Sequence, residues 1–392
     1  MENRQQLVSV VIPSFNAART IEATLDSVQA QTHRNLEILV VDDGSTDDSM
    51  ARVEERRRAD PRIRLVRKEN GGVASARNAG IAASRAAIVA FIDADDLWHP
   101  TKIEKQLAVM EQGGPELGLV YSPFRLIDLD GFVKESSWNY GVDGWVPHRH
   151  FHVNLVGNGS AIMVRRAVLE ELGGYSSALR AAGAEGCEDL ELQLRIAARY
   201  RFGCVPEYLV GYRRYVGNMS SDPDRMSRSG VLAVKTAYLE CRGIPGLSMS
   251  ALLDRYERQC VKTALRRGRL GEVFGYLWRE ARNQPWLLFA GGTVKLGELL
   301  QRRASRARAT LSSARRHFYD YAPDEGAQPG GNLWTRRAMA RLAQLDAGYR
   351  PAPAYFAAPN DRERGAADPG RGMLLRLAAF DAPPDIRQTQ PL

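Results

Sequence analysis

Short hydrophobic segments alternate with amphipathic ones through the first quarter of the chain. The segments at 7–12, 36–41, 63–66 and 88–92 are mostly apolar, which is typical of strands buried on both faces of a sheet. Between them, apolar residues recur three or four positions apart, as one face of a helix requires. Strands that alternate with helices predict an α/β fold, with a mostly parallel sheet flanked by helices. Ligands of such sheets bind beyond the carboxyl ends of the strands.

Residues that favour helix starts precede three of the amphipathic segments. Asn16 can cap a helix that follows the first strand. Ser45, with Asp48 three residues later, matches a capping box for the helix after the second strand. Pro100 suits the first position of a helix after the fourth strand.

After about residue 115 the pattern becomes less regular. Apolar runs at 117–121 and 160–164 predict two further strands. The segment 188–200 has the spacing of a helix. Within it, Glu191 and Arg195 lie four positions apart, which is the spacing of an ordinary ion pair on a helix surface.

The bulk composition narrows the function only slightly. The 392 residues allow one large α/β domain with a smaller region, or two ordinary domains. A net charge of +8 suits nucleic acid, an anionic membrane or phosphate-bearing ligands, and selects none of them. The four cysteines form no CxxC pair, which favours a reducing compartment. We see no signal peptide, and the longest apolar run, 286–294, is too short to span a membrane, so we predict no transmembrane segment.

The clearest chemical signal is the acidic motif that follows the fourth strand, Asp93-Ala94-Asp95-Asp96. Carboxylates this close repel one another unless a cation lies between them. Mg²⁺ and Mn²⁺ prefer such ligands together with phosphate oxygens of a substrate, and would neutralise charge on a departing diphosphate. The alternative is a solvated acidic turn in which Asp96 favours the start of the next helix. An isolated motif of this kind does not decide between the two.

Four other candidate ligand-binding sites each have a structural alternative. Asp42, after the second strand, can accept a hydrogen bond from a base or simply shape a turn. Phe15 can stack on a base or fill the core. Arg77, in a helix that follows two glycines, suits a phosphate or the surface. Glu188-Asp189 opens a helix, either as a general base for a hydroxyl or as acidic residues favoured by the helix dipole.

Two segments rich in basic residues or histidine stay open to two interpretations. His148, His150 and His152 alternate, which fits a metal site as well as a polar loop or strand face. The stretch 302–316 contains six arginines and no acidic residue. It can lie on an anionic membrane or form a solvated helix face.

Taken in order, these segments resemble the inverting glycosyltransferase family 2, which has the GT-A fold. The resemblance covers about residues 7 to 220, and four motifs in one order make it far more specific than any motif alone. The matching segments are Val10-Val11-Ile12-Pro13-Ser14-Phe15-Asn16, Val40 to Asp47, Asn70-Gly71-Gly72 with Ala76 to Gly80, and Asp93 to Pro100.

The resemblance implies roles for the candidate residues. Asp95 would be the main ligand of Mn²⁺ or Mg²⁺, with Asp93 beside it. Glu188-Asp189 resembles the ED motif of the family, in which the aspartate usually serves as the base, here Asp189. The transfer would be a single displacement that inverts the anomeric centre without a covalent sugar–enzyme intermediate. The donor-binding residues would be Pro13, Phe15, Asn16, Asp42, Arg77, Asp93 and Ala94.

Two features depart from the family pattern. A histidine often follows the ED helix in a Tyr-Arg-x-His-like segment, whereas Tyr215 stands at that place here. What then helps to hold the metal or the diphosphate is open, with Arg213 and Arg214 as candidates for the diphosphate. The segment 180–187 is rich in Gly and Ala, and we expect a mobile loop that orders when the donor binds.

The resemblance and the composition together suggest three regions. Residues 1–228 would form the GT-A domain, with 1–114 binding the nucleotide and 115–228 the acceptor. A helical region would follow at 229–320. The segment 321–392, rich in Pro, Ala and Arg, is typical of a flexible tail.

We therefore expect sugar transfer from a nucleotide-sugar to a hydroxyl of a saccharide or lipid-linked saccharide in cell-surface polysaccharide synthesis. A UDP-sugar is the commonest donor in the family. One alternative is a catalytically silent module that only binds the nucleotide-sugar. A nucleotidyltransferase would need a basic, glycine-rich loop where Ser14-Phe15-Asn16 stands. We expect a cytoplasmic protein without a nucleic-acid partner, and leave peripheral association with the inner face of the membrane open.

Overall fold

The structure is a computed structural model of the chain. It describes residues 6–241, 244–249, 252, 256, 264, 268, 271, 315–326 and 333–351. Within this part of the chain, no helix is both long and apolar enough to cross a membrane.

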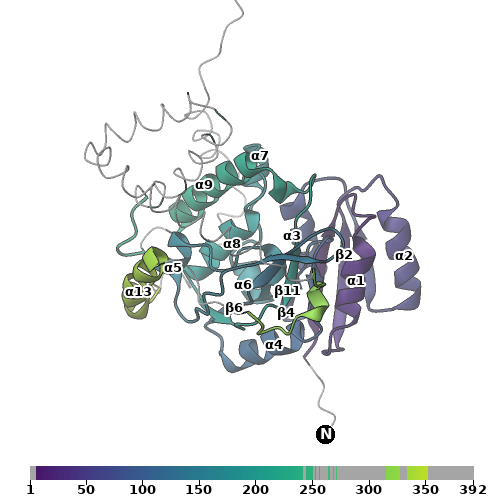
Figure 1. Ribbon diagram of the computed structural model, residues 1–392, viewed down its shortest axis with the longest axis horizontal. Helices are drawn as coiled ribbons and strands as arrows, with labels where there is room; N and C mark the ends of the chain where they lie inside the picture. Colours follow the sequence, from purple (N-terminus) through teal and green to yellow (C-terminus); the bar gives the residue numbers. More distant parts are fainter. Residues whose placement is uncertain are drawn as a thin grey trace, which may run out of the picture.

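A seven-stranded sheet forms the centre of the molecule (Figure 1). Every neighbouring pair of strands is parallel except at β9, which runs antiparallel to both of its neighbours. The predicted α/β fold with a mostly parallel sheet is thereby confirmed. In spatial order the strands are β10 (Arg201–Cys204), β6 (Leu117–Tyr121), β9 (Ile162–Arg165), β4 (Ile88–Phe91), β1 (Val8–Ser14), β2 (Leu36–Asp42) and β3 (Ile63–Arg67).

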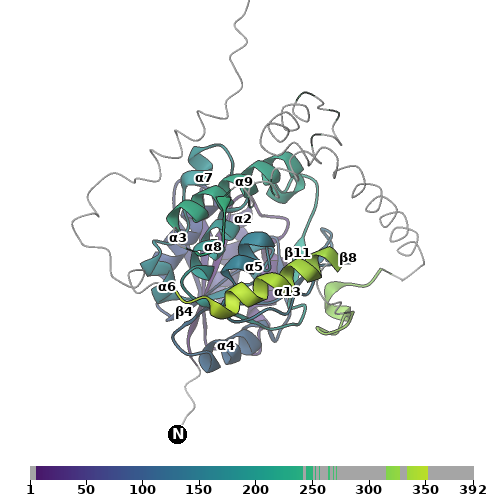
Figure 2. The same cartoon turned by 90° about the vertical axis from the view of Figure 1, so that its left-hand side faces the viewer.

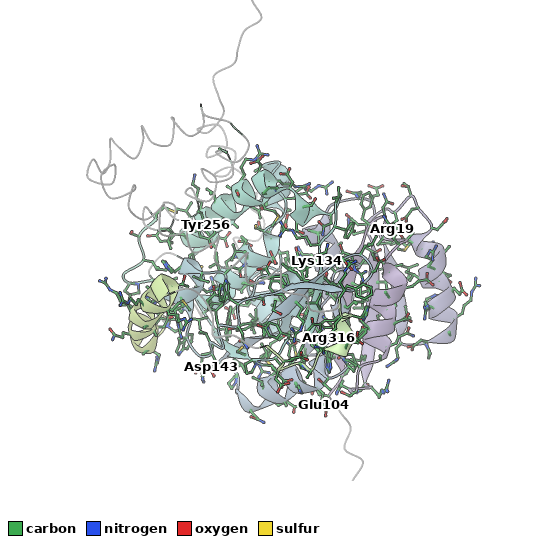
Figure 3. All side chains as sticks on the ribbon, in the orientation of Figure 1. Arg19, Glu104, Lys134, Asp143, Tyr256 and Arg316 are labelled. Atoms are coloured by element: carbon green, nitrogen blue, oxygen red, sulfur yellow. The ribbon has the colours of Figure 1, made fainter. Side chains whose placement is uncertain are left out.

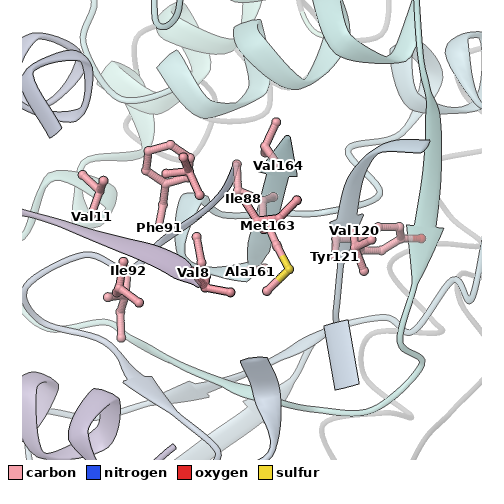
Figure 4. Packing of buried hydrophobic residues seen from close by; sticks show 14 of the residues in the cluster. Val8, Val11, Ile88, Phe91, Ile92, Val120, Tyr121, Ala161, Met163 and Val164 are labelled. Carbon is pink, nitrogen blue, oxygen red and sulfur yellow. The ribbon is translucent and has the colours of Figure 1, made fainter. Parts of the chain in front are cut away.

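The strands form because their apolar side chains are covered by helices on both sides. Every residue of β1 and β2 is buried, as their nearly continuous hydrophobic sequences predict. Figure 4 shows Val11, Phe91 and Val164 among the packed side chains of this core, and all three are fully excluded from solvent. The helices around the sheet are α1 (Ile21–Gln29), α2 (Ser49–Ala59), α3 (Val73–Ala83), α4 (Lys102–Gln112), α6 (Arg166–Glu171) and α8 (Glu188–Ala197).

The predicted caps at Asn16 and Ser45 are wrong. Helix α1 begins at Ile21, and Asn16 has a φ of 51° in the turn before it. Its side-chain oxygen accepts a hydrogen bond from the Thr46 N–H at 2.8 Å, while the Ser45 hydroxyl accepts one from the Asn16 N–H at 3.1 Å. Both side chains therefore join the turns that follow β1 and β2, since these turns face each other at the carboxyl edge of the sheet.

Glu191 and Arg195 of α8 were expected at the surface but are buried. Glu191 is fully excluded from solvent, and both of its carboxylate oxygens accept from Arg195, at 2.7 and 2.8 Å. The same guanidinium donates to the carbonyl oxygens of Leu172 and Gly174, both at 2.7 Å. Arg195 thus satisfies carbonyls at the end of α6, which the i,i+4 spacing alone could not reveal.

A smaller, four-stranded sheet lies beside the main one, in the order β5-β11-β7-β8. Residues 315–326 pack on it, with Phe318 buried and a β-bridge between Phe132 and His317. Arg316, labelled in Figure 3, forms an ion pair with Glu325 at 2.6 Å. The strands are β5 (Leu97–Trp98), β7 (Phe124–Ile127), β8 (Val133–Ser136) and β11 (Val210–Arg213).

Helix α13 (Leu333–Gly348) lies across α5 (Pro147–His152), as Figure 2 shows. Its Asp346 is buried, accepts from Arg149 Nε at 2.6 Å and contacts His148 Nδ1 at 2.8 Å. This packing differs from the flexible tail expected from residue 321. Most of the expected helical region at 229–320 lies outside the described residues. The remaining elements are α7 (Ala178–Ala181), α9 (Pro223–Glu240) and 3₁₀ turns at Gly159–Ala161, Met219–Ser221 and Phe318–Asp320.

We predict that Asp346→Asn loosens α13. Breaking a buried ion pair costs about 3 kcal/mol, so protection of α13 from hydrogen exchange should fall by roughly 100-fold. Burial lowers the pKa of His148, but the Asp346 carboxylate outweighs it and leaves that pKa raised. The ion pair of His148 with Asp346 therefore stabilises the docked helix fully below pH ~6.5, and this stabilisation is lost as the pH rises through the pKa of His148 in the folded protein. The stabilisation from the Arg149 ion pair persists at higher pH.

The matched control is Leu345→Ala, because Leu345 is an exposed residue of the same helix. It should change the protection of α13 only slightly. Equal protection in Asp346→Asn and the unaltered protein, after correction for the intrinsic pH dependence of exchange, would contradict this account of the docking.

Candidate active site

A cavity of about 280 Å³ opens at the carboxyl ends of β1 and β4. Segments far apart in the sequence line it: the turn after β1, helix α3, the acidic motif, the loop 154–159, the start of α8 and the segment after β11. It brings together nine of the ten residues predicted for the site. These are Pro13, Phe15, Asn16, Arg77, Asp93, Ala94, Asp95, Glu188 and Asp189.

Arg77 lies under this cavity, where helix α3 places it against the end of β4. Its side chain is almost fully buried, and its Nη2 atom lies 2.5 Å from Asp93 Oδ1. The guanidinium also sits 5.1 Å from the ring centroid of Tyr175. Burial alone would lower the pKa of Arg77, but Asp93, Tyr175 and Asp189 together hold it above its ordinary value. Arg77 therefore carries a permanent positive charge between two of the cavity's carboxylates.

The carboxylates of the acidic motif divide between two environments. Asp93 and Asp95 line the cavity, whereas Asp96 does not and is fully buried. Asp96 Oδ1 accepts from the Arg213 N–H at 2.8 Å, and its other oxygen accepts from the Ser160 hydroxyl. Asp96 thus ties β11 to the end of β4, and the helix α4 that it was expected to favour starts only at Lys102.

The environment of Asp95 disfavours its charged form. Burial and the neighbouring Asp93 raise the pKa of Asp95 to about 6, while Arg213 and a hydrogen bond with Tyr215 act in the opposite direction. Burial and Asp95 in turn raise the pKa of Tyr215 to about 12. An added cation near Asp95 would relieve this repulsion.

Glu188 and Asp189 reach the cavity from the N-terminus of α8. The two carboxylate oxygens of Glu188 accept from the Gly186 N–H, at 3.0 and 3.1 Å, and burial raises its pKa. Asp189 Oδ1 accepts from the Leu190 N–H at 2.8 Å. Burial raises the pKa of Asp189 to about 6, although Arg77 opposes the shift. A carboxylate with such a pKa accepts protons more readily near neutrality than an ordinary aspartate.

Asp42 is the predicted donor-binding residue that does not line the cavity. It is buried, and its Oδ1 accepts from the Ser45 N–H at 2.9 Å. Its neighbour Asp43, to which the sequence assigned no role of its own, accepts from the N–H groups of Gly71 and Gly72 at 2.9 and 2.7 Å. Asp43 therefore holds the glycine turn at the start of α3.

The remaining predicted residues are Phe15 and those of the segment at and after the end of β11. Phe15 is 51% exposed, so it is not a core aromatic. Tyr215 lines the cavity beside Asp95, at the place where the family pattern has its histidine. Arg213 is buried and Arg214 is exposed, and neither lines the cavity.

The segment 180–187, expected to be mobile, is tied by several side-chain contacts. Glu185 pairs with Arg180 at 3.3 Å and with Arg225 at 3.0 Å. Arg180 Nη2 also donates to Asn70 Oδ1 at 2.9 Å, next to the glycine turn. The ordering of this loop by the donor stays a prediction. If the loop moves, the ion pairs of Glu185 with Arg180 and Arg225 are the contacts that would have to rearrange.

Sequence reasoning missed several lining residues, among them Asn154, Asn158 and Tyr212. The asparagines lie in an Asn- and Gly-rich loop, whose composition indicates a turn but not its position in the molecule. Of the two interpretations of the alternating histidines, the contacts favour a structural role over a metal site: His148 contacts Asp346, and the buried His150 of helix α5 accepts from the Leu155 N–H at 3.3 Å. Burial lowers the pKa of His150 to about 3.

Known proteins resemble parts of this chain. A family model described as "Glycosyl transferase family 2" matches residues 9–173. An uncharacterized glycosyltransferase of Rickettsia felis is 46% identical over 105 residues, 27% of this chain and 17% of that protein. A UDP-Glc:alpha-D-GlcNAc-diphosphoundecaprenol beta-1,3-glucosyltransferase of Escherichia coli is 37% identical over 128 residues, 32% of this chain and 49% of that protein. The chain thus matches less than half the length of either relative.

Among solved structures, S. aureus TarS residues 1–349 in complex with UDP superposes with a TM-score of 0.49 and 17% sequence identity. The superposition covers 64% of this chain and 70% of that chain.

We predict that Asp96→Ala destabilises the protein. The substitution leaves the Arg213 N–H and the Ser160 hydroxyl without their acceptor, which should cost about 1–3 kcal/mol and lower the melting temperature. Asp96→Asn keeps a side-chain oxygen of the same shape and should melt close to the unaltered protein. Asp48→Ala is the control, since Asp48 is exposed and makes no side-chain cap. Identical melting of all three variants would show that Asp96 does not hold β11.

Proposed function

Residues 9–173 belong to glycosyl transferase family 2, and on that premise we propose that the protein transfers a sugar from a nucleotide-sugar to a hydroxyl group. The acceptor would be a saccharide or a lipid-linked saccharide in polysaccharide synthesis. One observation carries the proposal: a single cavity gathers Asp93, Asp95, Arg77 and Asp189 from three separate segments. A UDP-sugar donor is favoured because the E. coli relative is named for UDP-Glc.

The donor would lie along the turn after β1 and the acidic motif. The exposed ring of Phe15 is suited to stack on the base, since aromatic faces bind nucleobases in this way. Pro13, Asn16 and Ala94 line the same part of the cavity, and Asp93 would lie by the ribose. We assign Asp42 to the support of the turn after β2, which faces the turn after β1, because its carboxylate accepts from the Ser45 N–H.

Asp95, with Asp93, is the carboxylate pair that fits a divalent cation such as Mn²⁺ or Mg²⁺. Within the described residues, no group of three or more His, Cys, Asp or Glu is placed to hold a metal ion by itself. Other ligands would then come from the donor diphosphate and water, which is usual for Mg²⁺. A bound cation would neutralise the negative charge that develops on the departing diphosphate.

Asp189 is the base in this proposal. It would take the proton of the acceptor hydroxyl as that oxygen bonds to the anomeric carbon and the bond from this carbon to the diphosphate breaks. Attack opposite the leaving group inverts the anomeric centre. Glu188 is less suited, since both of its oxygens already accept from Gly186, whereas the backbone bond of Asp189 engages only Oδ1. Arg77 would stabilise the carboxylate form of Asp189 without contacting the acceptor.

A catalytically silent nucleotide-sugar-binding module is the second candidate. The observation behind it is Tyr215, which interacts with Asp95 where the family often has a histidine. A silent module would bind UDP in this cavity and release no nucleotide from any UDP-sugar. Turnover with a panel of UDP-, GDP- and dTDP-sugars separates the two candidates.

We predict that Asp189→Asn lowers the rate of transfer, or of donor hydrolysis, by roughly 10²- to 10⁴-fold, the usual contribution of a general base. The affinity for UDP should stay within a few-fold of the original, because Asp189 would contact the acceptor. Titration calorimetry and nucleotide release measure the two quantities. Unchanged turnover in this variant would remove Asp189 from the mechanism.

The rate should also depend on pH in a specific way. Asp189 acts as a base only when it is deprotonated, and burial raises its pKa to about 6. The logarithm of kcat/KM should therefore fall with unit slope below pH ~6 and level off above it. Affinity for UDP, measured over the same range, is the control. A rate that stays constant down to pH 5 would exclude a base with this pKa.

A further inference from the structure

A second groove lies next to the donor cavity. Its volume is about 210 Å³, and strands β7 and β8, the segment after β8 and the loop 154–157 line it. Asn154 and Gly157 line both this groove and the donor cavity. A ligand in the groove would therefore lie directly beside a sugar bound in the donor cavity. We refer to the groove lined by Phe124, Leu126, Glu135, Ser136, Ser137, Trp138, Tyr140 and Asn154 to Gly157 as the side groove.

The passage between the two spaces is shaped by a bare glycine. Gly157 has a φ of +91°, and a Cβ atom added there would lie 2.4 Å from a ring carbon of Phe124. The Phe124 ring packs edge-on against Tyr212, with the ring centroids 5.5 Å apart, and Tyr212 lines the donor cavity. Asn154 Oδ1 accepts from the Gly157 N–H at 2.8 Å, which fixes the turn. The two spaces therefore meet where Gly157 has no side chain, since any side chain there would clash with the Phe124 ring.

The chemistry of the side groove suits a neutral, hydroxyl-rich ring. Trp138 is 51% exposed, which is unusual for the largest apolar side chain. An aromatic face can pack on the C–H face of a pyranose, and Glu135, Tyr140 and Asn154 can exchange hydrogen bonds with its hydroxyls. No Lys or Arg lines the groove, so it is poorly suited to a phosphate or a nucleotide.

An unsatisfied amide stands where the two spaces meet. Asn158 is 3% exposed and lines the donor cavity next to Gly157. Within the part of the chain that the structure describes, neither its Oδ1 nor its Nδ2 has a hydrogen-bond partner. A buried amide left unpaired costs about 1–3 kcal/mol, so a ligand hydroxyl at this place would relieve that cost.

We propose that the side groove binds a pyranose ring of the acceptor, with Trp138 as its stacking surface and Asn158 as the amide that receives a sugar hydroxyl in the cavity that Asp189 also lines. This inference rests on the proposed function, since it gives the acceptor of that reaction a binding site. It makes Trp138 a residue that determines acceptor affinity without touching the donor.

The test is the binding of simple sugars, which saturation-transfer NMR measures. The probes are the methyl β-glycosides of glucose, galactose and N-acetylglucosamine at millimolar concentration. At least one should receive saturation on its ring protons from the unaltered protein. Trp138→Ala should weaken this binding by about tenfold, and Trp138→Phe should restore most of it, because phenylalanine keeps an aromatic face on which the sugar can pack. Tyr319→Ala, which removes another exposed aromatic outside both spaces, should bind as before.

Asn158→Leu gives an independent signature. It replaces an unpaired buried amide by an apolar group of similar size, so the melting temperature should rise while sugar binding weakens. A residue that serves only the fold would not change both quantities in opposite directions.

Two results would overturn the inference: no saturation transfer to any of the three sugars, or equal binding by Trp138→Ala and the unaltered protein. UDP affinity and donor hydrolysis, measured on the same variants, should be unchanged in Tyr319→Ala. If neither transfer nor hydrolysis of any donor occurs in any of the proteins while sugars still bind through Trp138, the proposed transfer fails and sugar binding by the side groove stands. If hydrolysis depends on Asp189 while Trp138 is irrelevant to sugar binding, the side-groove inference fails and the proposed transfer stands.

Discussion

The site depends on one buried positive charge. Arg77 lies beneath the cavity, 2.5 Å from Asp93, and Asp189 contributes to holding its pKa above the ordinary value. Without this charge, two carboxylates from distant parts of the chain would be desolvated together in a small space. At Asp95, burial and the neighbouring Asp93 outweigh Arg213 and the hydrogen bond with Tyr215, so its pKa is raised. The pKa of Asp189 is raised to about 6 as well, so Arg77 does not fully compensate the burial of this carboxylate either, and a cation beside Asp95 would add positive charge to the cavity.

Buried polar side chains hold the segments that line the cavity in place around Arg77. Asp43 fixes the glycine turn that starts α3, and so the helix that carries Arg77. Asp96 fastens β11, and with it the segment that brings Tyr215 to Asp95. Arg195 accounts for the carbonyls at the end of α6 while pairing with Glu191 on α8. At the acidic motif, Asp95 faces the cavity while its neighbour Asp96 faces the core.

The sequence was most informative where the pattern is local. Nearly continuous apolar runs predicted β1 and β2, and the acidic motif marked the end of β4, because a buried strand and its polar end are adjacent in the chain. It failed where a partner is distant. Asn16 and Ser45 have the chemistry of helix caps, yet each bonds to the turn that carries the other. The burial of Asp346, on a helix from the proline-rich end, arises from tertiary packing that no local spacing records, as does the second groove beside Trp138.

The central claim is that Asp95 and Asp93 hold a cation together with the donor diphosphate, above Arg77. The most direct measurement is an anomalous difference map at the manganese edge, from crystals of the protein grown with UDP and Mn²⁺. The account predicts one strong peak in the cavity, within coordination distance of an Asp95 oxygen and of the diphosphate oxygens. UDP bound in the cavity with no manganese at Asp95, or manganese bound only elsewhere on the protein, would contradict it.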